Sequence, residues 1–266
     1  MKYGCCLNMI AAGADKTGQE WIVTAKEAGF DYVELPLAEM MALSDEEFEA
    51  IIKRLERAEI PCEACNNFFP RSIRLTGPDV NMEEIMDYAV GALSRAEAIG
   101  AERLVFGSGP AKNVPDGFDM AEGYRQVVNL LKAVAPEAEK RGITIVIEPL
   151  RTAECNLINT YEEGCILAAD VNMASVKTLV DFYHLTEMKE PLSDVLKGKG
   201  GILAHVHFAN PTGRVYPKDT NEAAYEDFIN VLKETGYNER ISCEAYTRDF
   251  AAASRQALAL LKNYIG

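Results

Sequence analysis

Short runs of apolar, β-prone residues alternate along the chain with longer segments whose apolar residues recur at helical spacing. The runs predict strands at 3–7, 32–35, 61–65, 103–106, 143–147, 176–181, 202–208 and 241–244. The segments predict helices at 18–28, 44–58, 82–99, 120–140, 160–169, 192–196, 223–235 and 251–264. Eight strand–helix units in 266 residues match a (β/α)8 TIM barrel. No linker-like stretch divides them, so we expect a single domain over residues 1–266.

A doubly wound open sheet is the alternative α/β fold. It is disfavoured because no dinucleotide-binding glycine pattern follows the first strand. The longest irregular stretches, 66–80, 107–118 and 210–220, each follow a predicted strand. In a barrel they would lie on the carboxyl face, where TIM-barrel enzymes keep their active sites.

The run 143–147 is apolar on both faces, which is typical of a parallel strand that is buried on both sides. Glu148 follows it directly, and Pro149 ends the strand. A charged group at such a place is costly unless it is paired or bound to a metal. The pattern therefore suggests that Glu148 is a metal ligand.

Three further strand ends carry potential ligands: Asp181, His207 and Glu244. Strand ends on one barrel face converge, so these groups and Glu148 can meet around one ion. Three carboxylates and one imidazole suit Mn²⁺, Mg²⁺ or Co²⁺ better than a structural zinc site of Cys and His.

Each of these residues has an alternative interpretation. Asp181 can act as an ordinary helix N-cap, and His207 can be a hydrogen-bonded core histidine. Glu244 can form an ion pair with Arg214 or Arg248. His205 lies two residues before His207, so we expect it deeper on the same face, in a structural role.

Composition narrows the class of partner. The net charge is −14, and no Lys/Arg cluster is longer than two residues, which argues against nucleic acid or membrane partners. The N-terminus lacks a signal-type apolar segment, and no apolar run reaches membrane-spanning length. We therefore expect a soluble, cytoplasmic protein.

Seven scattered cysteines indicate reduced thiols. The Cys62–Cys65 pair has the spacing of a zinc or redox motif, but it falls in a predicted strand. Positions three apart in a strand point to opposite faces, so a structural role is favoured.

At these residues the chain resembles the xylose isomerase-like TIM-barrel superfamily of sugar phosphate isomerases and epimerases. Within it, the chain is most similar to the ketose 3-epimerases, which act on D-tagatose and D-psicose (allulose). The motifs that carry the resemblance are 30–37 (FDYVELPL), 43–45 (LSD), 77–79 (GPD), 147–150 (IEPL) with Glu154 and Asn156, 181–184 (DFYH), 205–207 (HVH) and 242–245 (SCEA).

The resemblance implies that Glu148, Asp181, His207 and Glu244 bind a divalent ion, usually Mn²⁺, which holds two oxygens of an open-chain ketose. It also implies that Glu148 and Glu244 are catalytic. One removes a proton from the carbon between them, a cis-enediolate forms, and the other returns a proton to the opposite face.

The same resemblance assigns Glu154, His184 and Arg214 as substrate contacts, with Asn156 assisting. Relatives are often dimers or tetramers, so a homo-oligomer is expected. The chain also departs from the family, because Arg151 stands where a neutral amide is expected and Arg214 is displaced by one position. With Arg71 and Arg74, these arginines could meet an anionic sugar derivative.

Several functions stay open at this point. The first is a ketose 3-epimerase that acts on a small-molecule sugar or sugar derivative. Alternatives are an aldose–ketose or hydroxypyruvate-type isomerase, and a lyase or dehydratase of the same fold that acts on a keto-sugar. An apurinic endonuclease-like phosphodiesterase is disfavoured by the three histidines and the acidic charge. The intact set of four strand-end ligands argues against a catalytically silent binding protein.

Overall fold

The computed structural model describes residues 1–265, and within them eight parallel strands close into a barrel in sequence order. Every strand pairs with its neighbours along the chain, and β8 closes the barrel on β1. The strands are β1 Lys2–Cys6, β2 Tyr32–Pro36, β3 Cys62–Asn66, β4 Arg103–Phe106, β5 Thr144–Ile147, β6 Val176–Asp181, β7 Leu203–Phe208 and β8 Arg240–Cys243. The predicted (β/α)8 barrel is confirmed, whereas the extent of the domain stays a prediction.

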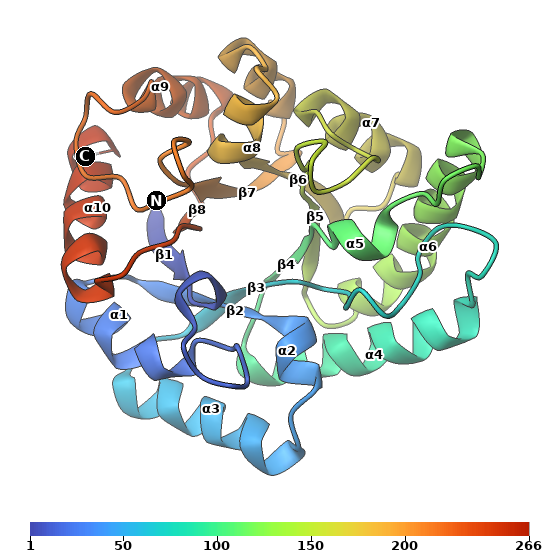
Figure 1. Cartoon of the computed structure of the whole chain (residues 1–266), viewed down its shortest axis with the longest axis horizontal. Helices are drawn as coiled ribbons and strands as arrows, with labels where there is room; N and C mark the ends of the chain where they lie inside the picture. The colour runs from blue at the N-terminus through green and yellow to red at the C-terminus, as the bar shows by residue number, and fades with distance from the viewer. Residues whose placement is uncertain (266) are drawn as a thin grey trace.

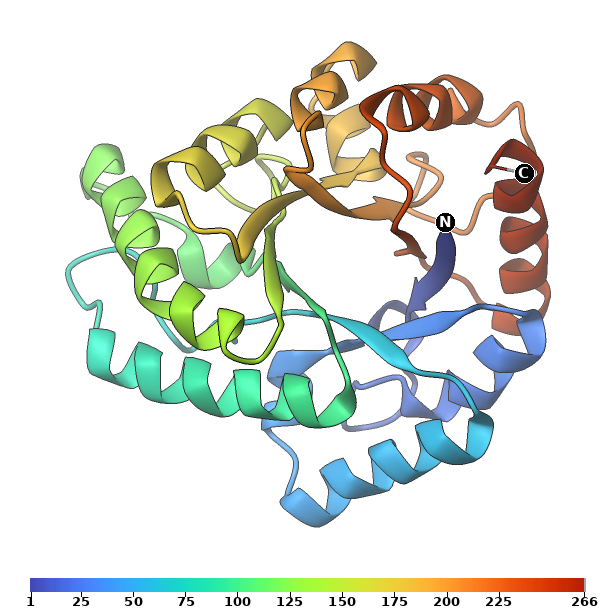
Figure 2. The same cartoon turned by 180° about the vertical axis from the view of Figure 1, so that it is seen from behind.

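The helices form an outer ring around the barrel, as both views of the molecule show (Figures 1 and 2). The larger ones are α1 Ile22–Ala28, α3 Asp45–Ala58, α4 Met82–Ile99, α6 Met120–Glu139, α7 Tyr161–Val171, α9 Tyr225–Thr235 and α10 Phe250–Ile265. Short helices that the sequence did not predict follow three strands: α2 Leu37–Met41, α5 Gly109–Lys112 and α8 Phe182–Glu187. The 3-10 segments are η1 Asn8–Ile10, η2 Gln19–Trp21 and η3 Leu192–Gly198. None of the described helices is both long and apolar enough to cross a membrane.

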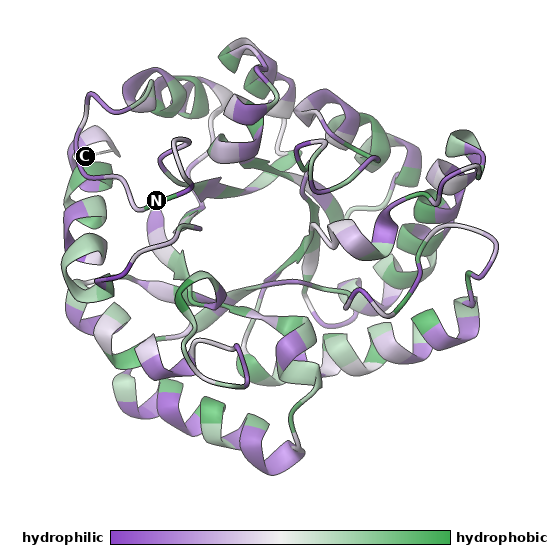
Figure 3. Ribbon diagram, in the orientation of Figure 1, coloured by the Kyte–Doolittle hydropathy of each residue, from purple (hydrophilic) through white to green (hydrophobic). Residues whose placement is uncertain are grey.

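Side chains alternate between the two faces of each strand, and the molecule has two separate clusters of buried apolar residues. Outward-facing strand residues join the helices in one large core, and Figure 3 shows hydrophobic residues recurring in bands along the outer helices. A second, small cluster is formed by residues from four neighbouring strands, Val105, Val146, Leu179 and Ala204. Because side chains alternate between the two faces of a strand, we place this cluster inside the barrel.

A bulge in β7 changes which residues face inward. Thr178 pairs with Leu203, but the next residue, Leu179, pairs with His205, so Ala204 is the extra residue. His205 and His207 are both fully buried, and their imidazole rings lie 5.1 Å apart. The expectation that they share one face is met.

The cysteines follow the predicted pattern. All seven are free thiols, and six of them are buried. Cys62 Sγ donates a hydrogen bond to the backbone carbonyl of Ala64. These observations agree with a structural role for the Cys62–Cys65 pair.

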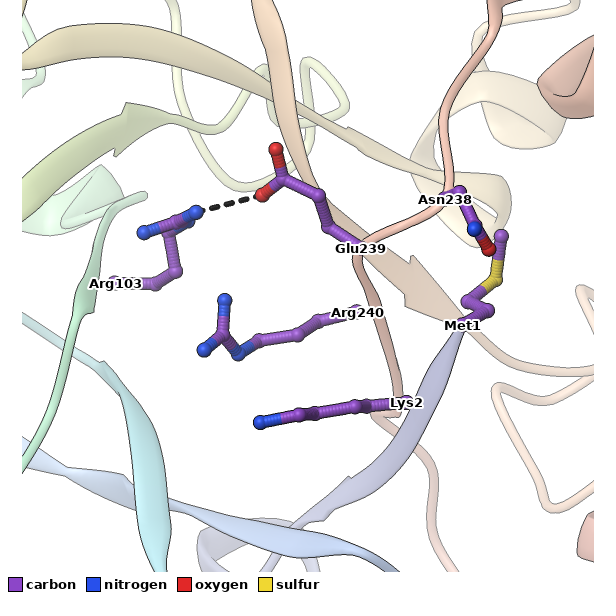
Figure 4. Close-up of a pocket in the computed structure, with 6 residues that line it drawn as sticks. All are labelled: Met1, Lys2, Arg103, Asn238, Glu239 and Arg240. Atoms are coloured by element: carbon purple, nitrogen blue, oxygen red, sulfur yellow. Dashed lines mark hydrogen bonds and ion pairs between the residues drawn. The ribbon is translucent and has the colours of Figure 1, made fainter.

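A pocket at the amino-terminal end of the barrel is lined by charged side chains, and Figure 4 shows the ion pair between Arg103 and Glu239 there. Arg240 bonds Glu63 at 2.6 Å and Glu102 at 2.7 Å, and Lys2 also bonds Glu63 at 2.6 Å. Arg103 reaches Glu239 at 2.6 Å. The Arg240 and Glu63 side chains are only 8% and 12% exposed, so neither charge is well solvated without the other.

Replacing Arg240 by Met is therefore expected to lower the free energy of unfolding by about 2–4 kcal/mol, because Glu63 loses a partner in a poorly solvated place. Urea unfolding followed by circular dichroism would measure the change. Arg125→Met is the control, since Arg125 forms an exposed pair with Glu122 and should leave the midpoint nearly unchanged. Equal midpoints for the two variants would contradict the structural role of this network.

Candidate metal centre and active site

Four polar side chains meet at the carboxyl end of the barrel. Glu148 follows β5, Asp181 ends β6, His207 lies near the end of β7, and Glu244 follows β8. Each of them offers a ligand atom, and these atoms all lie within 4.8 Å of one another. All four side chains are buried. The structure therefore brings together the four residues that the sequence singled out as metal ligands.

The position of Glu148 depends on a glycine in the neighbouring strand end. A Cβ atom added to Gly107, which follows β4, would lie 2.3 Å from Glu148 Oε2. The backbone on this side is held by Lys112, whose fully buried ammonium donates to the carbonyl of Gly107 at 2.6 Å and to that of Glu148 at 3.3 Å. Burial lowers the pKa of Lys112. The ends of β4 and β5 are thus fixed together beneath the Glu148 carboxylate.

His207 is the centre of the cluster. Its Nδ1 lies 2.9 Å from Glu148 Oε1 and 3.0 Å from Glu244 Oε2, so both carboxylates converge on one ring nitrogen. Burial lowers the pKa of His207, but the charges of Glu244 and Glu34 outweigh that effect and raise it well above the usual value. Burial raises the pKa of Glu148, and the nearby charge of Glu244 raises it further.

Asp181 combines two roles. Its carboxylate faces the cluster and also accepts a hydrogen bond of 2.7 Å from the backbone N–H of Tyr183, so it caps α8. The N-cap interpretation is therefore correct. It is compatible with metal binding because only Oδ1 makes the cap, and Oδ2 lies on the side of Arg214 and the cluster. Burial raises the pKa of Asp181 to about 6 against the opposing charge of Arg214.

Arg214 reaches into the cluster from the loop after β7. Its Nη2 lies 2.5 Å from Glu244 Oε2 and 3.2 Å from Asp181 Oδ2, and its guanidinium packs 4.8 Å from the centre of the Tyr183 ring. The predicted alternative of an ion pair between Glu244 and Arg214 is thus also present. Burial raises the pKa of Glu244, but the charges of Arg214 and His207 hold it well below its usual range.

His184 and Glu154 line the same side of the site. The Arg151 N–H donates to His184 Nδ1 at 3.3 Å, which assigns the ring proton to Nε2. Nε2 is buried and has no hydrogen-bond partner among the described residues, although Asp181 Oδ2 and Glu154 Oε2 lie 3.5 Å and 4.0 Å away. Burial lowers the pKa of His184 and favours the neutral ring. An unpaired N–H therefore points into the site.

The remaining arginines do not form a free anion site. Arg151 pairs with Glu154 at 2.8 Å and Glu187 at 2.9 Å. Arg74 donates to the backbone carbonyls of Pro110 in α5 and of Asn113 just after it, and Arg71 is exposed. Asn156 is also occupied elsewhere, because both ends of its amide bond the backbone of Val114. Its expected help with the substrate is not supported.

Sequence reasoning missed Glu34 on β2. Its side chain is fully buried and lies 3.0 Å from His207 Nε2 and 2.9 Å from His205 Nε2. Burial raises the pKa of Glu34, but the two histidines outweigh that effect and hold it well below the usual value. The signal was available, because Glu34 is a carboxylate between the apolar residues Val33 and Leu35 of a buried strand, as Glu148 is at the end of another.

These residues fit a divalent cation. The ligand atoms of three buried carboxylates and one imidazole lie within 4.8 Å of one another. Mutual repulsion of the carboxylates disfavours this arrangement unless a cation is present. An oxygen-rich set with one imidazole suits Mn²⁺, Mg²⁺ or Co²⁺. The unpaired Nε2–H of His184 beside this set offers a donor to an oxygen of a bound molecule.

Comparison with known proteins gives a consistent picture. A family model described as "Xylose isomerase-like TIM barrel" matches residues 22–264. The 2-oxo-tetronate isomerase of Cupriavidus necator is 28% identical over 66% of this chain and 65% of its own length. The D-psicose 3-epimerase of Agrobacterium fabrum is 25% identical over 49% of this chain and 44% of its own. The alignments thus span less than two thirds of these two curated relatives.

A solved structure supports the fold over the entire chain. A crystal structure of D-psicose 3-epimerase in the presence of D-fructose superposes with a TM-score of 0.86. It covers 100% of both chains at 20% identity, so it shows a shared fold. The sequence resemblance to this family and to its ketose 3-epimerases is confirmed.

Gly107→Ala is expected to displace Glu148 and to lower the free energy of unfolding by about 1–3 kcal/mol, because the added methyl overlaps the carboxylate. Isothermal titration with Mn²⁺ should also show weaker binding. Gly91→Ala is the control, since its Cβ would meet only the end of the Met41 side chain, 3.4 Å away. If Gly107→Ala matched Gly91→Ala in both stability and Mn²⁺ affinity, the close approach to Glu148 would have no consequence.

Proposed function

Because the chain belongs to the xylose isomerase-like TIM barrel family, we propose that it is a divalent-metal-dependent sugar isomerase or epimerase, and specifically a ketose 3-epimerase. The observation that carries the proposal is the pair Glu148 and Glu244. Their carboxylates come from different strand ends and approach the same nitrogen of His207 at 2.9 and 3.0 Å. Two carboxylates of this kind can act as base and acid on one substrate carbon.

Glu148, Asp181, His207 and Glu244 would hold the metal in this proposal, with Mn²⁺ as the expected ion. The ion would supply positive charge next to the substrate carbonyl and stabilise the negative charge that develops there. One glutamate removes the proton from C3 of the ketose, and a cis-enediolate forms. The other glutamate returns a proton to the opposite face, which inverts the configuration.

The substrate contacts in the proposal are His184, Glu154 and Arg214. The His184 Nε2–H would donate to a substrate oxygen, since it has no partner among the described residues. The Glu154 carboxylate can accept from a hydroxyl group, and Arg214 lies between it and the ligand set, 3.8 Å from Glu154 Oε2. Three different polar groups on one side of the site are suited to a polyhydroxylated molecule.

Charge favours a neutral sugar over a phosphorylated one. Arg151, Arg214 and the buried Lys112 are the cations of this region. The carboxylates around them are Glu34, Glu148, Glu154, Asp181, Glu187 and Glu244. Six carboxylates thus face three cations, so a bound divalent ion still leaves one negative charge. A dianionic phosphate would meet no excess of positive charge here.

The second candidate is an isomerase that moves a proton between neighbouring carbons of a keto acid. The relative named 2-oxo-tetronate isomerase supports it. A keto acid carries one negative charge, whereas a phosphate carries two. The net negative charge of the site therefore opposes binding of a keto acid less than binding of a phosphorylated sugar. The cytoplasmic location, the homo-oligomer and the identity of the metal stay predictions.

The two candidates give different products. The Mn²⁺-loaded protein in D₂O is expected to convert D-fructose or D-tagatose into its C3 epimer, with deuterium incorporated at C3, because the exchanged proton is the one that the glutamates transfer. NMR spectra of the products would measure this. Absence of any C3 epimer, together with turnover of 2-oxo-tetronate, would replace the leading proposal by the second.

Glu148→Gln and Glu244→Gln should each reduce kcat by about 10²–10⁴-fold, because an amide can neither accept nor return the proton. Steady-state assays with D-fructose would measure the loss, with metal content checked by elemental analysis. Glu239→Gln is the control, since Glu239 pairs with Arg103 at the opposite end of the barrel and should retain turnover. Full turnover in either active-site variant would contradict the acid–base pair.

A further inference from the structure

Glu34 is a buried carboxylate to which the proposed chemistry gives no task. It lies inside the barrel on β2, beneath the four proposed ligands, and its exposure is 0%. Its Oε1 lies 3.0 Å from His207 Nε2. Its Oε2 lies 2.9 Å from His205 Nε2 and accepts a hydrogen bond of 2.8 Å from the Ser242 hydroxyl. Each carboxylate oxygen therefore has its own partners.

The ring of His207 is shared between two groups of carboxylates. Nδ1 faces Glu148 and Glu244, whereas Nε2 faces Glu34. A histidine that binds a metal through one nitrogen must keep its proton on the other. A carboxylate at that second nitrogen fixes the proton and the ring orientation, and it makes the ligand more basic.

We propose that Glu34 is a positioning residue that keeps the proton of His207 on Nε2 and so directs Nδ1 at the metal. The inference rests on the proposed metal centre, but it does not depend on which sugar is the substrate. Glu34 acts through His207 and touches no reacting atom. It would set how tightly the ion is bound.

The surroundings of Glu34 make its orientation definite. The Tyr32 hydroxyl lies 2.8 Å from Ser242 Oγ, so Tyr32, Ser242 and Glu34 form a continuous hydrogen-bonded chain from the barrel interior to His207. The Tyr32 ring occupies the space that Gly4 leaves, because a Cβ atom on Gly4 would lie 2.2 Å from it. The Nε2–H groups of His205 and His207 are both satisfied only by a side chain whose two terminal atoms each accept a hydrogen bond. An amide would have to turn its NH₂ toward one of them.

Cys6 is the other neighbour of His207 Nε2, with its Sγ 3.9 Å away. Ligand atoms of Cys6, Glu34 and His207 lie within 4.8 Å of one another, so a second ion at this place is the competing interpretation. The hydrogen bonds favour positioning over a second ion. Oε2 of Glu34 is already engaged by His205 and Ser242, and Oε1 is directed at Nε2 itself.

The first measurement is metal affinity, for which Mn²⁺ and Zn²⁺ are titrated calorimetrically into the metal-free protein. Glu34→Gln is expected to weaken binding by about 10–100-fold, the usual effect of losing such a partner of a histidine ligand. The wild type should bind one ion per chain. Glu63→Gln is the matched control, because Glu63 is also a buried, hydrogen-bonded carboxylate inside the barrel but lies at the other end. Its affinity should stay within about twofold of the wild type.

The second measurement reads the proton directly. The chain has three histidines, so ¹⁵N spectra of the diamagnetic Zn²⁺ complex contain few imidazole signals. In the wild type and Glu63→Gln, the Nε2–H of His207 should give a proton signal that is protected from exchange with water. In Glu34→Gln at saturating Zn²⁺, this signal should shift or be lost. A role in stability alone would not move it.

Glu34→Asp keeps the charge but shortens the reach to His207, and it serves if Glu34→Gln does not fold. Its metal affinity should lie between those of the wild type and Glu34→Gln. Wild-type affinity and an unchanged His207 signal in a folded variant at position 34 would overturn the inference, and so would two ions per chain. A wild type that binds no divalent ion would contradict the metal centre itself. Failure to act on sugars, with these results intact, would contradict only the proposed reaction.

Discussion

The central constraint on this molecule is the electrostatic cost of holding three carboxylates against one another in a buried place. The carboxylates of Glu148, Asp181 and Glu244 lie close to one another and to the His207 ring at the carboxyl end of the barrel. Like charges at such distances disfavour ionisation unless positive charge or hydrogen-bond donors compensate for them. The other features of the site can be understood as responses to this cost.

Compensation comes from three directions. Arg214 reaches in from the loop after β7 and pairs with Glu244 and Asp181. His207 supplies a ring nitrogen to Glu148 and Glu244, and Glu34 faces its other nitrogen. A divalent ion would complete the balance from the centre. On the side of β4 to β7, the apolar residues of the inner cluster separate this region from the ion pairs around Arg240 at the opposite end. On the other side, Tyr32, Ser242 and Glu34 continue the polar network into the barrel interior.

The four proposed metal ligands lie at strand ends, whereas the proposed substrate contacts come from the segments that follow the strands. Glu154 lies after β5, His184 lies in α8, and Arg214 lies after β7. Changes in these segments can alter the substrate without altering the ligands. Arg151 illustrates the point, because it holds Glu154 and Glu187 and packs near Tyr183, next to the proposed substrate contacts.

Apolar periodicity predicted the order of the strands and of the larger helices, because it records which faces are buried, but it did not predict the short helices α2, α5 and α8. The sequence also singled out Glu148, Asp181, His207 and Glu244, since a polar residue at the end of a buried strand is conspicuous. Which side chains meet across the barrel depends on the closed sheet, in which residues far apart in the chain become neighbours. Glu34 was missed because its partners, His205, His207 and Ser242, lie far away in the chain. Asn156 was expected near the substrate but holds the loop at Val114, since the direction of a loop side chain depends on contacts that no local pattern encodes.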